Sequence, residues 1–169
     1  TRATQKFALT TNSTAEEANN LFSSFVNSYG MNVAEVTALS AQLFKTIDLG
    51  RIKASDMANT IGRVIAPAAA LGVSALEVQS ALAVITQTGV RPSDAMTQML
   101  NVMNELIKPS KAFAEVIKEW GYSSGEAAIK SEGFMSVLQR IVKEGESGGL
   151  AKLGAMFNDI RGFRGIVSL

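Results

Sequence analysis

The sequence predicts an all-α protein, an irregular multi-helix bundle of short antiparallel helices with a helical C-terminal tail. Three observations support this fold class. Apolar residues recur at intervals of three and four along nearly the whole chain, short polar residues stand where helices would begin, and glycines stand where they would end. No comparable run of alternating β-branched residues predicts a strand.

The apolar stripes fix the order of the helices. Phe22, Phe25 and Tyr29 share one helix face, and Val78 with Leu82 share a face further along the chain. Together the stripes and their boundaries predict helices at residues 2–10, 14–29, 33–48, 56–71, 75–88, 93–107, 110–120, 133–144 and 150–167.

Three of these helices begin at a capping-box sequence. In such a box a short polar N-cap residue and a glutamate three positions later each accept a backbone N–H that the helix leaves unpaired. The pattern occurs at residues 13–16, 32–35 and 74–77. A serine cap such as Ser74 is worth roughly 1 kcal/mol, which fixes where a helix begins but does not determine the fold.

Glycines and prolines predict where the helices end. A glycine can adopt the left-handed backbone of a helix C-terminus without the steric cost of a Cβ atom. The glycines expected in this role are Gly30, Gly50, Gly72, Gly89 and Gly121. Pro92 and Pro109 separate successive helices, whereas Pro67 falls inside residues 56–71 and predicts a kink or a restart there.

The predicted domain organisation has three parts. Residues 1–121 form a helical core domain, residues 122–132 form a linker or hinge, and residues 133–169 form a C-terminal helical segment. The linker is expected because residues 122–132 carry serine and glycine and interrupt the apolar stripes.

The composition favours packing over electrostatic binding. Lys plus Arg number 16 and Asp plus Glu number 15, so the net charge is +1 and no strong field is available to hold nucleic acid. We therefore expect no sequence-specific nucleic-acid partner. Hydrophobic residues make up 47% of the 169 residues and charged residues 18%, which favours apolar faces shared with partner proteins.

The residue types needed for most active sites are missing from the sequence. There is no histidine and no cysteine, which removes the commonest general base, the thiolate nucleophile and the commonest metal ligands. Glu115 and Glu119 share a helix face, but Lys111 and Lys118 flank them, which is typical of a solvated charged face. We expect no catalytic, cofactor-binding or metal-binding residue, no cofactor and no enzymatic activity.

Two further features of the sequence bear on its surroundings. The longest charge-free stretch near the middle, Val64 to Leu76, has thirteen residues, fewer than the roughly 20 that a membrane-spanning helix needs. The chain begins at Thr1 without an apolar leader and ends at Leu169 without a stop signal. We expect it to be a segment of a longer protein.

Met96, Met99 and Met103 form a stripe with two interpretations. Unbranched thioether side chains adapt to irregular surfaces, so the stripe could be a partner-contact face. The alternative, which we favour, is that all three belong to the core.

Several landmarks between Leu71 and Tyr122 occur in an order that resembles the core region of bacteriophage tail tape measure proteins. They are Gly72-Val73-Ser74, Gly89-Val90, the helix start from Ser93 to Met99, Pro109-Ser110 and Trp120-Gly121-Tyr122. The helix caps and stops among them are Gly72, Ser74, Glu77, Gly89, Pro92, Ser93, Thr97, Pro109 and Gly121.

The resemblance covers most of the chain, from Ser13 to Ile166. Two departures stand out, since Met96 occupies a position where these proteins have glycine and Lys108 one where they have asparagine. Both departures concern local packing.

The resemblance implies a structural virion protein that acts in tail length determination, tail tube assembly and genome ejection through the host envelope. It implies contacts with other copies of the same chain, the tail tube protein, tail assembly chaperones, tail tip proteins and the host envelope. The implied locations are the lumen of the phage tail, the host cytoplasm during assembly and the host envelope on ejection. The alternative is a helical protein–protein adaptor module without a virion role.

Overall fold

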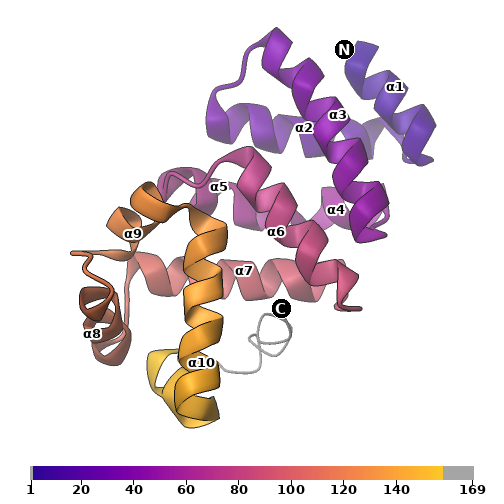
Figure 1. Cartoon of the computed structure of the whole chain (residues 1–169). Coiled ribbons are helices and arrows are strands. Elements are labelled where there is room, and N and C mark those ends of the chain that lie inside the picture. Colours follow the sequence, from indigo (N-terminus) through magenta and orange to yellow (C-terminus); the bar gives the residue numbers. More distant parts are fainter. Residues whose placement is uncertain (1, 158–169) are drawn as a thin grey trace.

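The computed structural model describes residues 2–157, and throughout this range the regular elements are helices, which confirms the all-α prediction. Figure 1 shows their arrangement. In chain order they are α1 (Arg2–Thr11), α2 (Ala15–Tyr29), α3 (Val33–Gly50), α4 (Ala54–Thr60), α5 (Gly62–Ala70), α6 (Ala75–Gln87), α7 (Pro92–Ile107), α8 (Lys111–Glu119), α9 (Gly125–Glu132) and α10 (Phe134–Met156). The predicted helix 150–167 extends beyond Phe157 into residues outside the described range.

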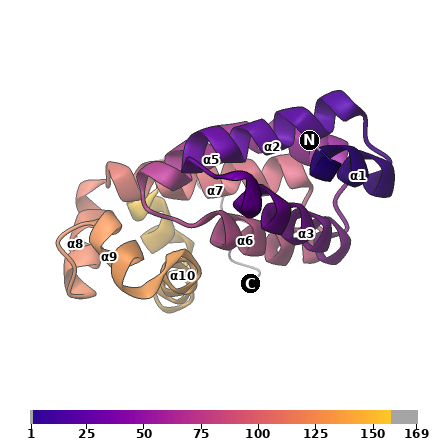
Figure 2. The same ribbon diagram turned by 90° about the horizontal axis from the view of Figure 1, so that it is seen from above.

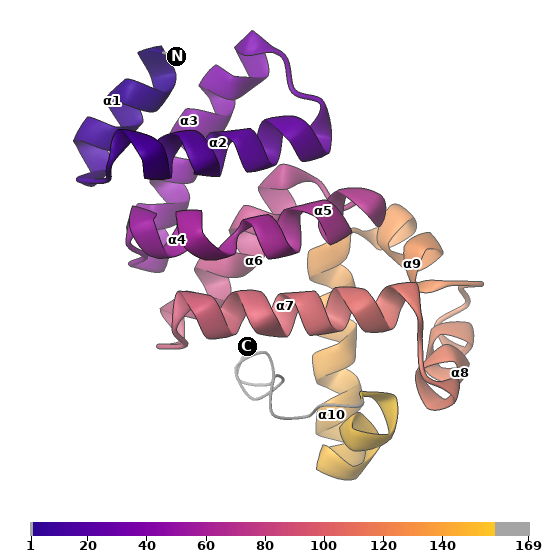
Figure 3. The same cartoon turned by 180° about the vertical axis from the view of Figure 1, so that it is seen from behind.

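The helices pack in layers. Figure 3 shows α2, then α4 with α5, then α7 in successive rows, and neighbouring rows are in contact. Figure 2 shows α3 and α6 side by side on one face of these rows, and α3 with α6 is the most extensive helix pair. Helix α1 packs against α2 and α3, and α8, α9 and α10 lie together at the opposite end.

The capping boxes form at three helix starts, although one is shifted by a residue. Asn32 caps α3 and Ser74 caps α6, each with the glutamate three residues later. At α2 the N-cap is Thr14 rather than the predicted Ser13, and its partner is Glu17. Ser13 instead belongs to the end of α1, where its N–H donates to the carbonyl of Ala8 and its hydroxyl lies 2.9 Å from that of Thr11.

The predicted stop at Gly50 is wrong by one residue. Gly50 is the last residue of α3, and Arg51 takes the left-handed conformation with φ 51°. A Cβ atom on Gly50 would lie 2.7 Å from Oγ1 of Thr86 on α6. This glycine therefore permits close packing of α3 on α6, and the energetic cost of the left-handed turn falls on an arginine.

The predicted kink at Pro67 is also displaced. Pro67 lies inside α5, and the break between α4 and α5 falls at Ile61. A proline disturbs the turn that precedes it, because it lacks an N–H and its ring crowds the carbonyl four residues earlier. Gly62, a poor helix former, lies just before that turn, so the helix separates there.

The segment predicted as a linker, residues 122–132, contains helix α9. Ser124 accepts a hydrogen bond from the N–H of Ala127 and so caps a helix, and Ile129 buries its side chain in the core. Ser124 and Gly125, which indicated a loop, instead begin a short helix. The division of the chain into a core domain, residues 1–121, and a C-terminal helical segment, residues 133–169, stays a prediction.

Helix α10 reverses direction near its end. Gly149 has non-helical angles, φ 68° and ψ −174°, and separates a long first part from a short second part. The second part folds back on the first, since a Cβ atom on Gly145 would lie 2.6 Å from Cδ1 of Leu153. The reversal brings Phe157 to Phe113 of α8, with ring centroids 5.1 Å apart.

One hydrophobic cluster extends from Phe7 in α1 to Phe157 at the end of the described chain. At one end the rings of Phe7 and Phe22 meet edge to face, with centroids 5.3 Å apart. At the other end Phe113 meets Trp120 in the same geometry at 6.0 Å. The core is therefore continuous through all the layers.

Candidate functional site

The turn between α5 and α6 holds the central landmarks of the sequence. Gly72 has φ 76°, and Ser74 follows as the N-cap of α6. The carboxylate of Glu77 accepts hydrogen bonds from the N–H and the hydroxyl of Ser74, at 3.0 and 2.8 Å. The hydroxyl of Tyr29, at the end of α2, donates to the carbonyl of Val73 at 2.7 Å and ties this turn to the first layer.

The turn between α6 and α7 contains the next landmarks. Gly89 has φ 90°, and Pro92 is the first residue of α7. Ser93 was expected to begin this helix, but the N-cap is Arg91, which makes no side-chain cap bond and pairs with Asp94 at 2.9 Å. Thr97 lies one turn further along α7, where its hydroxyl donates to the carbonyl of Ser93.

The connection after α7 joins two distant parts of the chain. Pro109 follows α7, and Ser110 accepts the N–H of Phe113 as the N-cap of α8. The same hydroxyl donates to the carbonyl of Met156 at 3.0 Å, so the start of α8 and the end of α10 share one side chain. Gly121, with φ 91°, ends the helical turn after α8.

The methionine stripe lies in the core. Met99 and Met103 are fully buried and Met96 is 3% exposed. The stripe therefore offers no surface to a partner in this conformation, and its adaptable side chains fill the space between α7 and its neighbours. Met96 occupies the position where the resemblance led us to expect a glycine, and its side chain packs in the interior.

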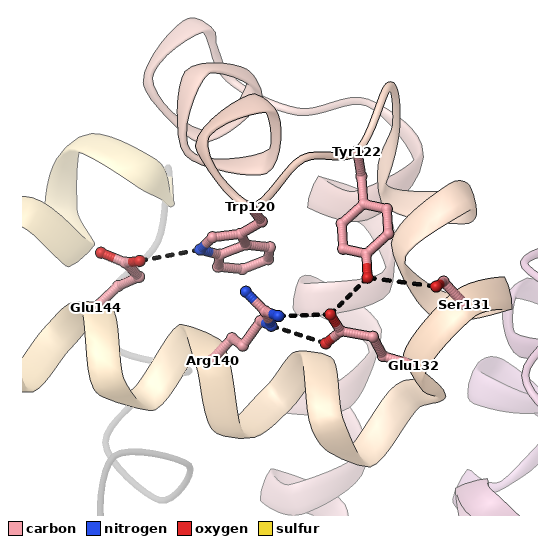
Figure 4. Close-up of polar contacts among 6 residues, drawn as sticks. All are labelled: Trp120, Tyr122, Ser131, Glu132, Arg140 and Glu144. Atoms are coloured by element: carbon pink, nitrogen blue, oxygen red, sulfur yellow. Dashed lines mark hydrogen bonds and ion pairs between the residues drawn. The ribbon is translucent and has the colours of Figure 1, made fainter.

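A polar network joins α8, α9 and α10, and Figure 4 shows its members. The guanidinium of Arg140 donates to both oxygens of Glu132, with Nε to Oε2 at 2.7 Å and Nη2 to Oε1 at 2.5 Å. The hydroxyl of Tyr122 donates to the same carboxylate at 2.5 Å. Arg140 also lies over the ring of Trp120, 5.8 Å from its centroid, in a cation–π contact.

A second carboxylate extends this network along α10. The indole N–H of Trp120 donates to Oε1 of Glu144 at 2.9 Å, and the ammonium of Lys152 pairs with Oε2. Glu144 and Lys152 lie on opposite sides of the break at Gly149, so their pairing holds the reversed end of α10 in place.

The network is suited to holding helices rather than to acid–base chemistry. Hydrogen bonds from Tyr122 and Arg140 lower the pKa of Glu132, and hydrogen bonds from Lys152 and Trp120 lower the pKa of Glu144. Both carboxylates are ionised and paired at neutral pH, whereas a general acid needs a raised pKa. Sequence spacing could not reveal these pairs, because each crosses a helix boundary or a break.

The pH dependence of stability follows from these shifts. Burial would raise the pKa of Glu77, but hydrogen bonds from Ser74 and from the N–H of Phe134 lower it below the ordinary value. Lowered glutamate pKa values mean that the folded chain binds fewer protons than the unfolded chain in mild acid. Their contribution to stability is thus complete above the ordinary glutamate pKa, about 4.3, and is lost as the pH falls through the lower folded values.

We therefore expect urea midpoints that hold steady from about pH 6 to pH 9 and decline below about pH 4.5. At the alkaline end the pairing with Glu144 raises the pKa of Lys152, so its contribution is lost only above about pH 10. Urea titrations monitored by circular dichroism across this range measure the profile. The double variant Glu132→Gln, Glu144→Gln is the control and should show a weaker acid dependence, and an unchanged dependence would contradict this origin.

Two apolar grooves flank α1. One of about 420 Å³ lies among α1, α2 and α3 and includes Phe22 and Val36 in its lining. The other, of about 470 Å³, lies between α1 and α3 and includes Phe7 and Phe44. Val33 of the first groove is exposed, and large apolar side chains are also exposed elsewhere on the described surface: Leu9, Leu49, Leu76, Val84 and Ile107.

Glu115 and Glu119 are both exposed on α8. Within residues 2–157 no group of three or more acidic side chains is placed to hold a metal ion. Over the same range no helix is both long enough and apolar enough to cross a membrane.

The fold is that of an all-α structural protein. Hydrogen bonds between side chains and between side chain and backbone join its helices. The family model described as phage-related minor tail protein matches residues 1–162. The chain belongs to that family, which gives it a structural role and a location in the phage tail. No curated protein and no solved structure matches the chain.

Proposed function

We propose that this chain is a segment of a tail tape measure protein, the component whose length determines the length of the tail. The observation that carries the proposal is the family match over residues 1–162 of a chain built as stacked short helices. The order of glycine, proline and serine landmarks between Gly72 and Gly121, which resembles these proteins, supports the same assignment.

The mechanism that we propose is packing followed by unpacking. During assembly the apolar surface beside α1 would bind helices from other copies, the tail tube protein or tail assembly chaperones. At the tip the chain would meet the tail tip proteins, and on ejection it would leave the lumen and reach the host envelope. Local caps fix where α2, α3 and α6 begin, so these helices would form again at the same boundaries after unpacking, which suits such a cycle.

Deleting α2 and α3 from the intact protein tests this function. A tape measure that lies as helix along the tail should lose about 1.5 Å of tail for each residue removed, or roughly 55 Å for residues 14–50. Tail lengths measured by electron microscopy give the result. Leu76→Ala is the control, because it alters an exposed apolar side chain outside both grooves without altering chain length, and tails of unchanged length in the deletion would contradict the proposal.

The alternative function is a helical adaptor without a virion role. The grooves beside α1 are the feature that favours it, since the methionine stripe predicted as its binding face is buried. An adaptor should be a stable monomer by light scattering, whereas a tape measure segment should associate with other copies. Our proposal also holds that the segment is not an enzyme, and release of muropeptides from peptidoglycan incubated with it would contradict that part.

A further inference from the structure

Helix α10 begins without a cap of its own. Its N-cap residue is Gly133, which has no side chain to accept a hydrogen bond. The N–H of Phe134 instead donates to Oε1 of Glu77 at 2.7 Å, across 57 residues of sequence. The cap of α10 is therefore supplied by α6.

One carboxylate serves two helix starts. Oε2 of Glu77 accepts the N–H and hydroxyl of Ser74 and completes the capping box of α6, while Oε1 accepts the N–H of Phe134. Both helices direct their positive N-terminal ends at the same negative charge, which favours the ionised carboxylate. Removing this side chain would leave the N–H groups of Phe134 and Ser74 without their acceptor, while α6 would keep the Ser74 hydroxyl as its cap.

Gly133 makes the contact geometrically feasible. Its φ is +81°, and a Cβ atom at this position would lie 2.9 Å from Oε1 of Glu77. A side chain here would be strained and would push the carboxylate away from Phe134. The contact between Glu77 and α10 therefore depends on the glycine.

The remaining interface between α6 and α10 is open. A groove of about 310 Å³ lies between them, lined by Val84 on α6 and by Leu138 and Val142 on α10. Val84 is 38% exposed, so the two helices do not close over this apolar surface. Helix α10 packs mainly on α8 and α9 and touches α6 more sparsely, and the Glu77 contact lies at the start of α10 in that sparse interface.

We propose that Glu77 is a conformational latch: its carboxylate ties the start of α10 to α6, and releasing that contact lets α10 open from α6 while α2 to α5 stay folded. Opening widens the groove and exposes Leu138 and Val142, whose side chains are buried while α10 lies against α6. The latch is a property of this chain alone and does not rest on the proposed function.

Amide hydrogen exchange on the 169-residue chain tests the latch. In Glu77→Ala the amides of residues 137–142 should exchange about fivefold faster or more, the factor that corresponds to a lost N-cap. Those of α2 and α5 should keep their rates. In Ser74→Ala, which removes the hydroxyl cap of α6 and keeps the carboxylate, residues 137–142 should keep their protection.

Gly133→Ala provides a second route to the same release, since it leaves Glu77 in place but blocks its approach to Phe134. It should accelerate exchange at residues 137–142 and leave α2 and α5 unchanged. Unchanged exchange at residues 137–142 in Glu77→Ala would overturn the proposal. So would equal acceleration in every helix, or acceleration in Ser74→Ala as large as in Glu77→Ala.

Discussion

Replacing Phe113 with alanine should remove about 3–5 kcal/mol from the free energy of unfolding, the range measured for buried phenylalanines. Phe113 is fully buried at the end of the core where the chain returns after the break in α10. Its ring contacts both Trp120 and Phe157, with centroids 6.0 and 5.1 Å away, so truncation leaves a cavity between α8 and the reversed segment. Urea denaturation followed by circular dichroism measures the loss.

Phe44→Ala is the matched control for Phe113→Ala. Phe44 is the same residue type on α3, but 47% of it is exposed, so its truncation should cost only about 1 kcal/mol. Equal losses in the two variants would show that the aromatic cluster at Phe113 does not anchor the C-terminal helices. A small loss in both would lead to the same conclusion.

Replacing Gly125 with alanine is the second change with a large expected effect. A Cβ atom at this position would lie 2.5 Å from the carbonyl oxygen of Leu106 and 2.9 Å from its Cα atom. These are backbone atoms of α7, so the overlap is relieved only by moving α9 away from α7. We expect a loss of about 3 kcal/mol, at the upper end of the usual range for overpacking.

Gly62→Ala is the control for this second change. Gly62 is also helical, but the nearest atom to its added Cβ would be the hydroxyl of Ser24 at 3.6 Å, an ordinary contact. Alanine there should be neutral or should stabilise by roughly 0.5–1 kcal/mol, because it favours helix. Thermal unfolding of both variants distinguishes the cases, and a Gly125→Ala chain as stable as Gly62→Ala would refute the close approach of α9 to α7.

Features set by neighbouring residues were predictable from the sequence. The boxes at Asn32 and Ser74 depend on side chains three residues apart, and the left-handed turns at Gly30 and Gly72 depend on the absence of a Cβ atom. Such local rules operate before any tertiary contact forms. They located most helix starts and several helix ends.

Features set by distant contacts could not be predicted. Gly50 reads as a helix stop, but its close contact with Thr86 on α6 decides its role. The pairing of Arg140 with Glu132 requires α9 to exist first, and α9 itself was hidden in a segment that resembles a loop. In both places tertiary packing overrides local propensity.

The borrowed cap of α10 also bears on the order in which the chain can acquire its structure. The starts of α2, α3, α6, α8 and α9 are closed by side chains within three residues, so those helices can form from local contacts, which are quick to make. The start of α10 needs a carboxylate 57 residues earlier, a pairing with a larger loop-closure cost. Because Glu77 precedes Phe134, a ribosome delivers the cap before the helix that needs it, and synthesis from the N-terminus favours an ordered, late closure of this end of the molecule.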